Sequence, residues 1–124
     1  MPDPTPRGVL ISRDLMFTSK VTGTAQQLGL SVVVVPDGAA ATRQIAASPV
    51  QCMFIDLSLP PWDLPAFIAS LPSDGRPTII AFGSHVATEK LQEARTAGCD
   101  EVLPRSRFSG ELPALLIKHL GPMS

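Results

Sequence analysis

The sequence predicts one α/β domain organised around a parallel β-sheet that is covered by helices on both faces. Five short apolar runs alternate along the chain with segments of helical periodicity, and this alternation is typical of parallel sheets. The third run, Val-Gln-Cys-Met-Phe-Ile from residue 50, is almost unbroken by polar residues, as expected of a strand that is buried on both faces. At 124 residues, the chain has the length of a single domain.

The five apolar runs are predicted to be the strands of this sheet. Asp56 ends the third run, and Pro60 and Pro61 then exclude a strand or a helix for several residues. Pro104 ends the fifth run. The predicted strands cover residues 8–12, 31–35, 50–56, 78–82 and 101–103. Seven of their side chains are predicted to lie in the core: Val9, Ile11, Val33, Met53, Ile55, Ile79 and Phe82.

Five helices are predicted between and after the strands. In the first helix, Phe17, Val21 and Ala25 recur at helical spacing, and Gly29 follows as a C-terminal cap. Asp37 and Asp63 are predicted to cap the second and third helices. The predicted helices cover residues 14–28, 38–47, 64–71, 86–97 and 113–120.

The domain organisation is predicted to be simple. Residues 1–7 include three prolines and are expected to form a flexible leader, followed by one domain over residues 8–121. The sequence contains neither an apolar stretch close to the roughly 20 residues of a membrane span nor the apolar core of a signal peptide. We therefore expect a soluble, cytoplasmic protein that contacts no membrane.

Composition argues against several other classes of function. The net charge is −1 without a basic stripe, and there is no tyrosine; both features argue against a nucleic-acid partner. Cys52 and Cys99 are far apart and form neither a CxxC motif nor a ligand cluster. They are expected to be buried, reduced thiols and not a disulfide or a metal site.

Three short motifs stand on the predicted elements. They are Pro-Asp-Gly at 36–38, Asp-Leu-x-x-Pro at 56–60 and Gly-Cys-Asp-Glu-Val-Leu at 98–103. In this order they resemble the receiver domain of bacterial two-component response regulators, and the resemblance covers residues 8–120. It implies a three-layer flavodoxin-like (βα)5 fold with strand order 2-1-3-4-5 and a site where the first and third strands diverge.

The resemblance also implies a site for phosphorelay chemistry. In the family, an aspartate after the third strand accepts a phosphoryl group from a histidine kinase, and a lysine after the fifth strand pairs with that group. Asp56 matches the acceptor aspartate, and Arg105 stands at the lysine position. Arginine keeps the positive charge of lysine but presents it as a planar fork.

Two other positions of the family pattern differ in this sequence. The family has two acidic residues after the first strand, which help to hold Mg²⁺. Here Ser12 and Arg13 stand in their place, and Asp14 comes one position late. The hydroxyl residue after the fourth strand is replaced by Gly83, which is followed by Ser84.

These replacements weaken the predicted metal site, because Mg²⁺ requires near-octahedral oxygen ligands that usually include one or two carboxylates. We therefore expect no cofactor, and Asp56 and Asp14 would hold Mg²⁺ only in a competent site. Two interpretations of Arg13 stay open. It pairs with Asp56 and occupies the nucleophile, or it points to solvent while Asp14 turns into the site.

Three functions are compatible with the sequence. The first is a degenerate receiver, or pseudo-receiver, that signals by binding a protein partner and is not an enzyme. The second is a competent receiver that uses Asp56 as its phospho-acceptor. The third is a small flavodoxin-like cofactor binder, suggested by hydroxyl residues after the first strand, namely Thr18, Ser19, Thr22 and Thr24.

The first two functions require a protein partner. It would be a histidine kinase, an output protein or a second copy of the chain in a homodimer. The resemblance places the contact surface on the face that is formed by the fourth helix, the fifth strand and the fifth helix. The apolar residues expected at its centre are Leu91, Val102 and Leu116.

Overall fold

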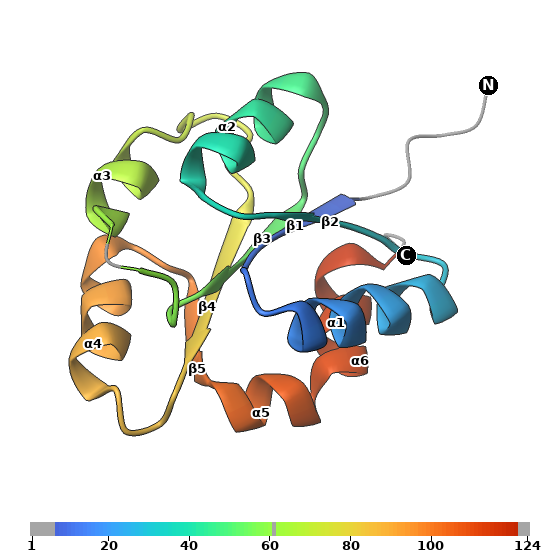
Figure 1. Ribbon diagram of the computed structural model, residues 1–124. Helices are drawn as coiled ribbons and strands as arrows, with labels where there is room; N and C mark the ends of the chain where they lie inside the picture. The colour runs from blue at the N-terminus through green and yellow to red at the C-terminus, as the bar shows by residue number, and fades with distance from the viewer. Residues whose placement is uncertain (1–6, 61, 122–124) are drawn as a thin grey trace.

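A five-stranded parallel sheet forms the centre of the molecule in a computed structural model that describes residues 7–60 and 62–121 (Figure 1). The strand order is β2-β1-β3-β4-β5, and every neighbouring pair is parallel. The predicted fold class and strand order are therefore confirmed. The strands are β1 (Arg7–Ile11), β2 (Ser31–Val35), β3 (Cys52–Asp56), β4 (Thr78–Gly83) and β5 (Glu101–Pro104).

The central strand β3 explains why the third run is continuously apolar. It pairs with β1 on one side and with β4 on the other, and all of its residues are buried. Alternate side chains of a strand point to opposite faces of the sheet. Met53 and Ile55 accordingly join the core on one face, whereas Cys52 and Phe54 join the core on the other.

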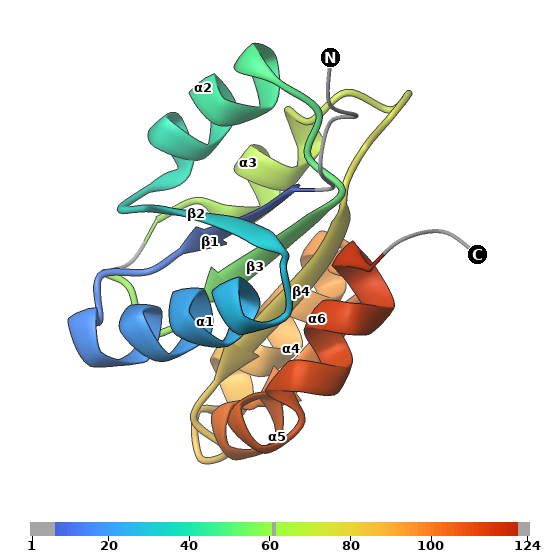
Figure 2. The ribbon, with the colours of Figure 1, turned by 90° about the vertical axis from the view of Figure 1, so that its right-hand side faces the viewer.

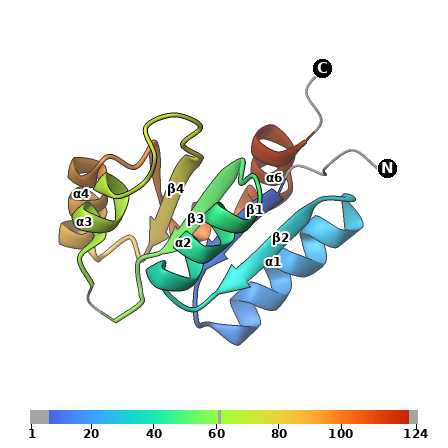
Figure 3. The same ribbon diagram turned by 90° about the horizontal axis from the view of Figure 1, so that it is seen from above.

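Helices cover both faces of the sheet and form the outer two of three layers (Figures 1 and 2). One face packs against α2 (Gly38–Ala47), α3 (Leu64–Ala69) and α4 (Thr88–Ala97). The other packs against α1 (Leu15–Gln27), α5 (Arg105–Gly110) and α6 (Leu112–Leu120). Seen from above, α3 and α4 lie side by side (Figure 3). In the described part of the chain, no helix has the length and apolar character needed to cross a membrane.

Aspartate side chains cap three of the helices. The carboxylates of Asp14, Asp37 and Asp63 accept hydrogen bonds from backbone N–H groups in the first turns of α1, α2 and α3, at 2.8 to 3.0 Å. Such a cap satisfies one of the backbone donors that a helix leaves free at its N-terminus. The predicted caps Asp37 and Asp63 are thus confirmed.

The predicted core is correct with one exception. Val9, Ile11, Met53, Ile55, Ile79 and Phe82 are each fully buried. Val33 is only partly buried, because it lies on β2, one of the two edge strands of the sheet.

The ends of several elements differ from the prediction. Arg7, expected in the leader, is the first residue of β1 and donates a hydrogen bond to the side chain of Gln44 at 3.0 Å. The remainder of that leader lies outside the described residues. Val86, expected in the fourth helix, precedes α4 and is 73% exposed.

The last helix was predicted to begin near Pro113, but the structure has two helices after β5. The additional helix α5 begins at Arg105, directly after the strand. Its one buried residue is Phe108, which packs against the aromatic side chains of the core. Because a single apolar residue creates no periodic pattern, this helix could not be predicted from periodicity.

Candidate functional site

Asp56 lies at the end of β3, and its side chain is 1% exposed. Four donors reach its two oxygens. Oδ2 accepts a hydrogen bond from Ser12 Oγ at 2.7 Å. Oδ1 accepts from Ser58 N at 2.9 Å, Ser58 Oγ at 2.6 Å and Arg105 Nη2 at 2.7 Å. A buried carboxylate requires such partners to offset the loss of water, and here both oxygens are engaged.

Ser12 connects Asp56 to the start of α1. Its backbone N–H donates to the carbonyl of Val35 on β2 at 3.0 Å, which fixes the residue just after β1. Its hydroxyl donates to Asp56 and also accepts from the backbone N–H of Asp14 at 3.2 Å. Ser12 thus occupies, with a short neutral side chain, a place where the resemblance implies a carboxylate.

Arg105 supplies the positive charge of the site. Besides its bond to Asp56, Nη2 donates to Ser58 Oγ at 3.1 Å, and Nη1 lies 3.9 Å from Asp14 Oδ2. The guanidinium also lies over two aromatic rings, with Cζ at 4.9 Å from the centroid of Phe17 and 5.3 Å from that of Phe82. One cation therefore contacts two carboxylates and two rings.

Arg13 does not take part in the site. Its Nε donates to the backbone carbonyl of Pro36 at 3.2 Å, and the residue is exposed. Of the two interpretations of Arg13, pairing with Asp56 is wrong, because Arg105 occupies that place, and Arg13 is exposed to solvent. Asp14 caps α1 through Oδ1, which accepts from Phe17 N at 3.0 Å, while its Oδ2 lies 3.9 Å from Arg105 Nη1 at the edge of the site.

Phe82, not Gly83, is the β4 residue beside Asp56. The strands pair Asp56 with Phe82, and side chains at paired positions share one face of the sheet. A Cβ added at Gly83 would lie 3.1 Å from Leu57 Cβ, which places that side chain on the opposite face. Ser84 lies in the following loop, where its Oγ accepts from Val86 N at 3.4 Å. In the described residues, β4 thus provides Asp56 with an aromatic ring instead of a hydroxyl.

Two residues of the site were not predicted from the sequence. Ser58 bonds to Asp56 through both its N–H and its hydroxyl. The signal for it was present, because a serine two positions after an aspartate suits the turn that an aspartate side chain forms with the backbone. Phe82 was predicted only as a core residue, and its place beside Asp56 depends on the register of two strands.

The side chains at this edge of the sheet are unsuited to binding Mg²⁺. No group of three or more His, Cys, Asp and Glu side chains that could hold a metal occurs in residues 7–60 and 62–121. The nearby carboxylates, Asp14 and Asp56, both face the guanidinium of Arg105. A divalent ion that uses these oxygens would have to approach a fixed positive charge.

The hydroxyl residues after β1 do not form a phosphate loop. They lie within α1, where Thr18, Thr22 and Thr24 donate their side-chain hydrogen bonds to carbonyls of the same helix at 2.8 to 3.1 Å. These contacts remove the observation that suggested a cofactor binder.

Both cysteine thiols are shielded from water. Burial, followed by the negative charges of Asp100 and Glu101, raises the pKa of Cys52 far above its usual value. Burial, followed by Asp100, raises the pKa of Cys99 from 9.0 to about 11. Cys52 is buried as expected, and Cys99 is partly buried. Thiols with raised pKa values are poor nucleophiles near neutral pH.

The side chains predicted at the centre of a partner surface are mostly in the core. Leu91 is 7% exposed and Leu116 is fully buried, while Val102 is partly buried against the core. Leu91 and Leu116 were therefore wrongly predicted as contact residues, because each faces the sheet. The large apolar side chains that are most exposed lie elsewhere, at Leu15 and Met16 at the start of α1.

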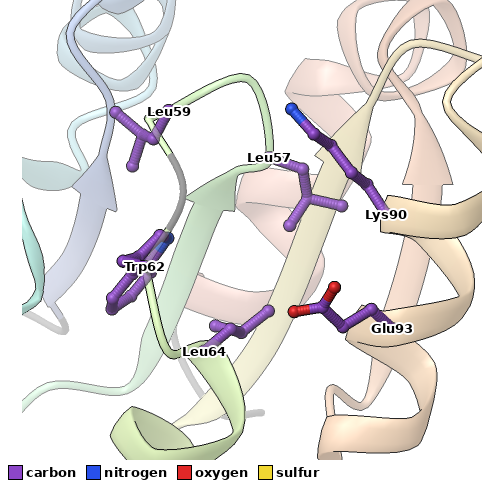
Figure 4. Close-up of a pocket in the computed structure, with 6 residues that line it drawn as sticks. All are labelled: Leu57, Leu59, Trp62, Leu64, Lys90 and Glu93. Carbon is purple, nitrogen blue, oxygen red and sulfur yellow. The ribbon is translucent and has the colours of Figure 1, made fainter.

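An apolar cavity of about 110 Å³ lies between α4 and the loop that follows β3 (Figure 4). Leu57, which follows Asp56, points into it, and Lys90 and Glu93 of α4 stand at its side (Figure 4). Leu59, Trp62 and Leu64 complete the lining. Its apolar lining makes it unsuited to the phosphoryl chemistry implied for Asp56.

No protein-family model matches the chain, and no curated protein matches it. Solved structures do match it. A response-regulator signal receiver domain from Bermanella marisrubri has a TM-score of 0.77 at 22% identity, over 91% of this chain and 96% of that one. The chemotaxis response regulator CheY4 of Vibrio cholerae has a TM-score of 0.75 at 18% identity, over 94% and 99%.

A third structure is the receiver domain of a sensor histidine kinase from Pseudomonas aeruginosa, with a magnesium ion coordinated in its active-site cleft. It matches with a TM-score of 0.76 at 21% identity, over 94% of this chain and 98% of that one. In each of these pairs, nearly all of both chains superimposes although few residues are identical. The chain therefore has the flavodoxin-like fold of response-regulator receiver domains.

Proposed function

We propose that this chain is a receiver-like signalling module that acts by binding another protein and does not use Mg²⁺-dependent phosphorylation of Asp56. The observation that carries this proposal is that the carboxylate of Asp56 is both buried and fully hydrogen-bonded. Its Oδ2 accepts a hydrogen bond from Ser12, and its Oδ1 accepts hydrogen bonds from Ser58 and Arg105. The side chain is 1% exposed.

Phosphoryl transfer to Asp56 would have to overcome three features of the site. Each oxygen that could attack is already hydrogen-bonded, and the side chain is buried. Catalysis of this reaction depends on positioning and on neutralising the phosphoryl oxygens, and Arg105 is already committed to Asp56. The ring of Phe82 has no donor for those oxygens, whereas a hydroxyl would have one.

The fold supports a role in two-component signalling with a histidine kinase or an output protein as the partner, in the cytoplasm. The similar structures include a domain of a sensor histidine kinase and a chemotaxis response regulator, so receiver folds of this size occur in both settings. A second copy of the chain is the other candidate partner. Leu15 and Met16 have exposed apolar side chains, and they are the candidate contact residues for such a homodimer.

A competent phospho-acceptor is the alternative function, and one observation favours it. Asp56 ends the central strand, at the edge where ligand sites of open parallel sheets are found. The alternative requires Arg105 and Ser12 to release the carboxylate when a phosphodonor arrives.

Intact-mass spectrometry separates the two functions. The protein is incubated with acetyl phosphate and Mg²⁺, beside Asp56→Ala as the control. We expect no phosphoryl mass increment in either protein. An increment in the natural protein that is absent from Asp56→Ala would contradict the proposal and establish Asp56 as the acceptor.

A further inference from the structure

We propose that Arg105 is a permanent, built-in counter-ion of Asp56, held in place by an aromatic clamp that consists of Phe17 and Phe82, and that it takes the place of a divalent cation. This inference concerns the Asp56 site and rests on the proposed function. It goes further by naming what holds the guanidinium and what the guanidinium excludes.

The clamp brings together rings from two different elements. Phe17 lies in the first turn of α1 and Phe82 on β4, and their ring centroids are 5.0 Å apart. Phe82 in turn stacks on Phe108 of α5, at 4.3 Å and an interplanar angle of 8°. Because Phe82 and Phe108 are fully buried and Phe17 is 9% exposed, the close packing of the core fixes the rings.

A guanidinium suits this clamp better than an ammonium does. Its planar face interacts with aromatic rings while the N–H groups at its edge stay free to bond. Arg105 uses both features, with its centre over Phe17 and Phe82 and its Nη2 bonded to Asp56 and Ser58. The rings thus restrict the side chain to positions from which it reaches Asp56.

The position of the guanidinium explains why a metal would be excluded. Its two terminal nitrogens face the two carboxylates of the site, with Nη2 at 2.7 Å from Asp56 and Nη1 at 3.9 Å from Asp14. A metal ion that bridges these carboxylates would lie within a few ångströms of a fixed positive charge. Because the guanidinium is part of the protein itself, this counter-ion is independent of metal concentration.

A magnesium titration tests the exclusion. Melting temperature and heat of binding are measured with increasing Mg²⁺ for the natural protein, Arg105→Met and Arg105→Gln. We expect no saturable response from the natural protein. Both variants should melt at a lower temperature without Mg²⁺, and their Mg²⁺ affinity should rise by about tenfold or more, because two carboxylates have lost their cation. The gain should disappear when Asp56→Asn is added.

Two matched substitutions of Phe17, which lines a pocket beside Arg105, test the clamp. Phe17→Tyr keeps the ring and Phe17→Leu removes it. The readout is the NMR signals of the Arg105 guanidinium N–H groups. They should be separate, with slow rotation, in the natural protein and in Phe17→Tyr. In Phe17→Leu they should merge, and a weak Mg²⁺ response should follow.

Each result bears on the inference. It is overturned if the natural protein binds Mg²⁺ as well as the Arg105 variants do, or if no folded Arg105 variant gains Mg²⁺ affinity. It is also overturned if Phe17→Leu leaves the guanidinium signals unchanged. Phosphorylation of the natural protein at Asp56 would instead defeat the proposed function, whatever the Mg²⁺ titrations give.

Discussion

At the scale of single residues, the buried carboxylate of Asp56 depends on each of its donors. Ser12 provides the hydrogen bond to Oδ2, and Ser58 and Arg105 provide those to Oδ1. Loss of a donor to a buried charged group costs more than the hydrogen bond contributes, since the group stays without water.

Ser12→Ala should therefore destabilise the fold although it removes a single oxygen atom. We expect the free energy of unfolding to fall by about 1–3 kcal/mol, measured by urea denaturation. Ser84→Ala is the matched control, because Ser84 is exposed and such substitutions change stability by only about 0.5 kcal/mol. Equal effects of the two substitutions would show that the bond to Asp56 is unimportant for stability.

The cysteines should make stability depend on pH in the alkaline range. Burial raises the pKa of Cys99 from 9.0 to about 11, so the folded protein holds that proton more tightly than the unfolded chain does. This contribution is fully present below pH 9.0 and should be lost as the pH rises towards about 11. Denaturation at a series of pH values should show a shallower decline for Cys99→Ala, and identical slopes would contradict the assignment.

At the scale of elements, the sequence predicts best where burial leaves a pattern. The strand runs and the helix caps Asp37 and Asp63 were recognised because each depends on local residues. The additional helix α5 was missed because only Phe108 of its residues is buried. The position of Phe82 beside Asp56 comes from the pairing of β4 with β3, and the choice of Arg105 over Arg13 as the partner comes from the packing of α5. Both features depend on contacts between residues far apart in the sequence, so a local sequence pattern does not predict them.

The missed helix offers a direct test of how α5 is held. Phe108→Ala removes the buried ring that anchors α5 and supports the clamp, so we expect a loss of about 3–5 kcal/mol in the free energy of unfolding. Ile117→Ala on the neighbouring helix is the control, because Ile117 is 54% exposed and should lose far less. Comparable losses in the two variants, measured by denaturation, would mean that α5 is not anchored through Phe108.

At the scale of the whole molecule, the site ties together distant parts of the chain. Ser12 and Asp56 are 44 positions apart, and Asp56 and Arg105 are 49 positions apart. The bonds of the site therefore join β1, β3 and the start of α5. Any change to its charges is a change to the stability of the fold.

Introducing the acidic pair that the resemblance to receiver domains implies should make the stability of the molecule depend on metal. Ser12→Asp places a carboxylate next to Asp56, and Arg13→Asp adds a second one after β1, so we expect a lower melting temperature that Mg²⁺ partly restores. Adding Arg105→Lys should enlarge the Mg²⁺ effect, since an ammonium binds rings and carboxylates less rigidly. If the melting temperature of the triple variant is insensitive to Mg²⁺, these three positions do not determine metal binding.

Trp62 has a practical consequence for such experiments. It is the one tryptophan of a chain that has no tyrosine, and it lies in the loop that follows β3. Its ring packs on Phe67 at a centroid distance of 5.0 Å and covers Gly38, where an added Cβ would approach it to 2.6 Å. The tryptophan fluorescence of the unlabelled protein therefore comes from this loop, and a shift in its emission would report a change in the surroundings of the loop that follows β3.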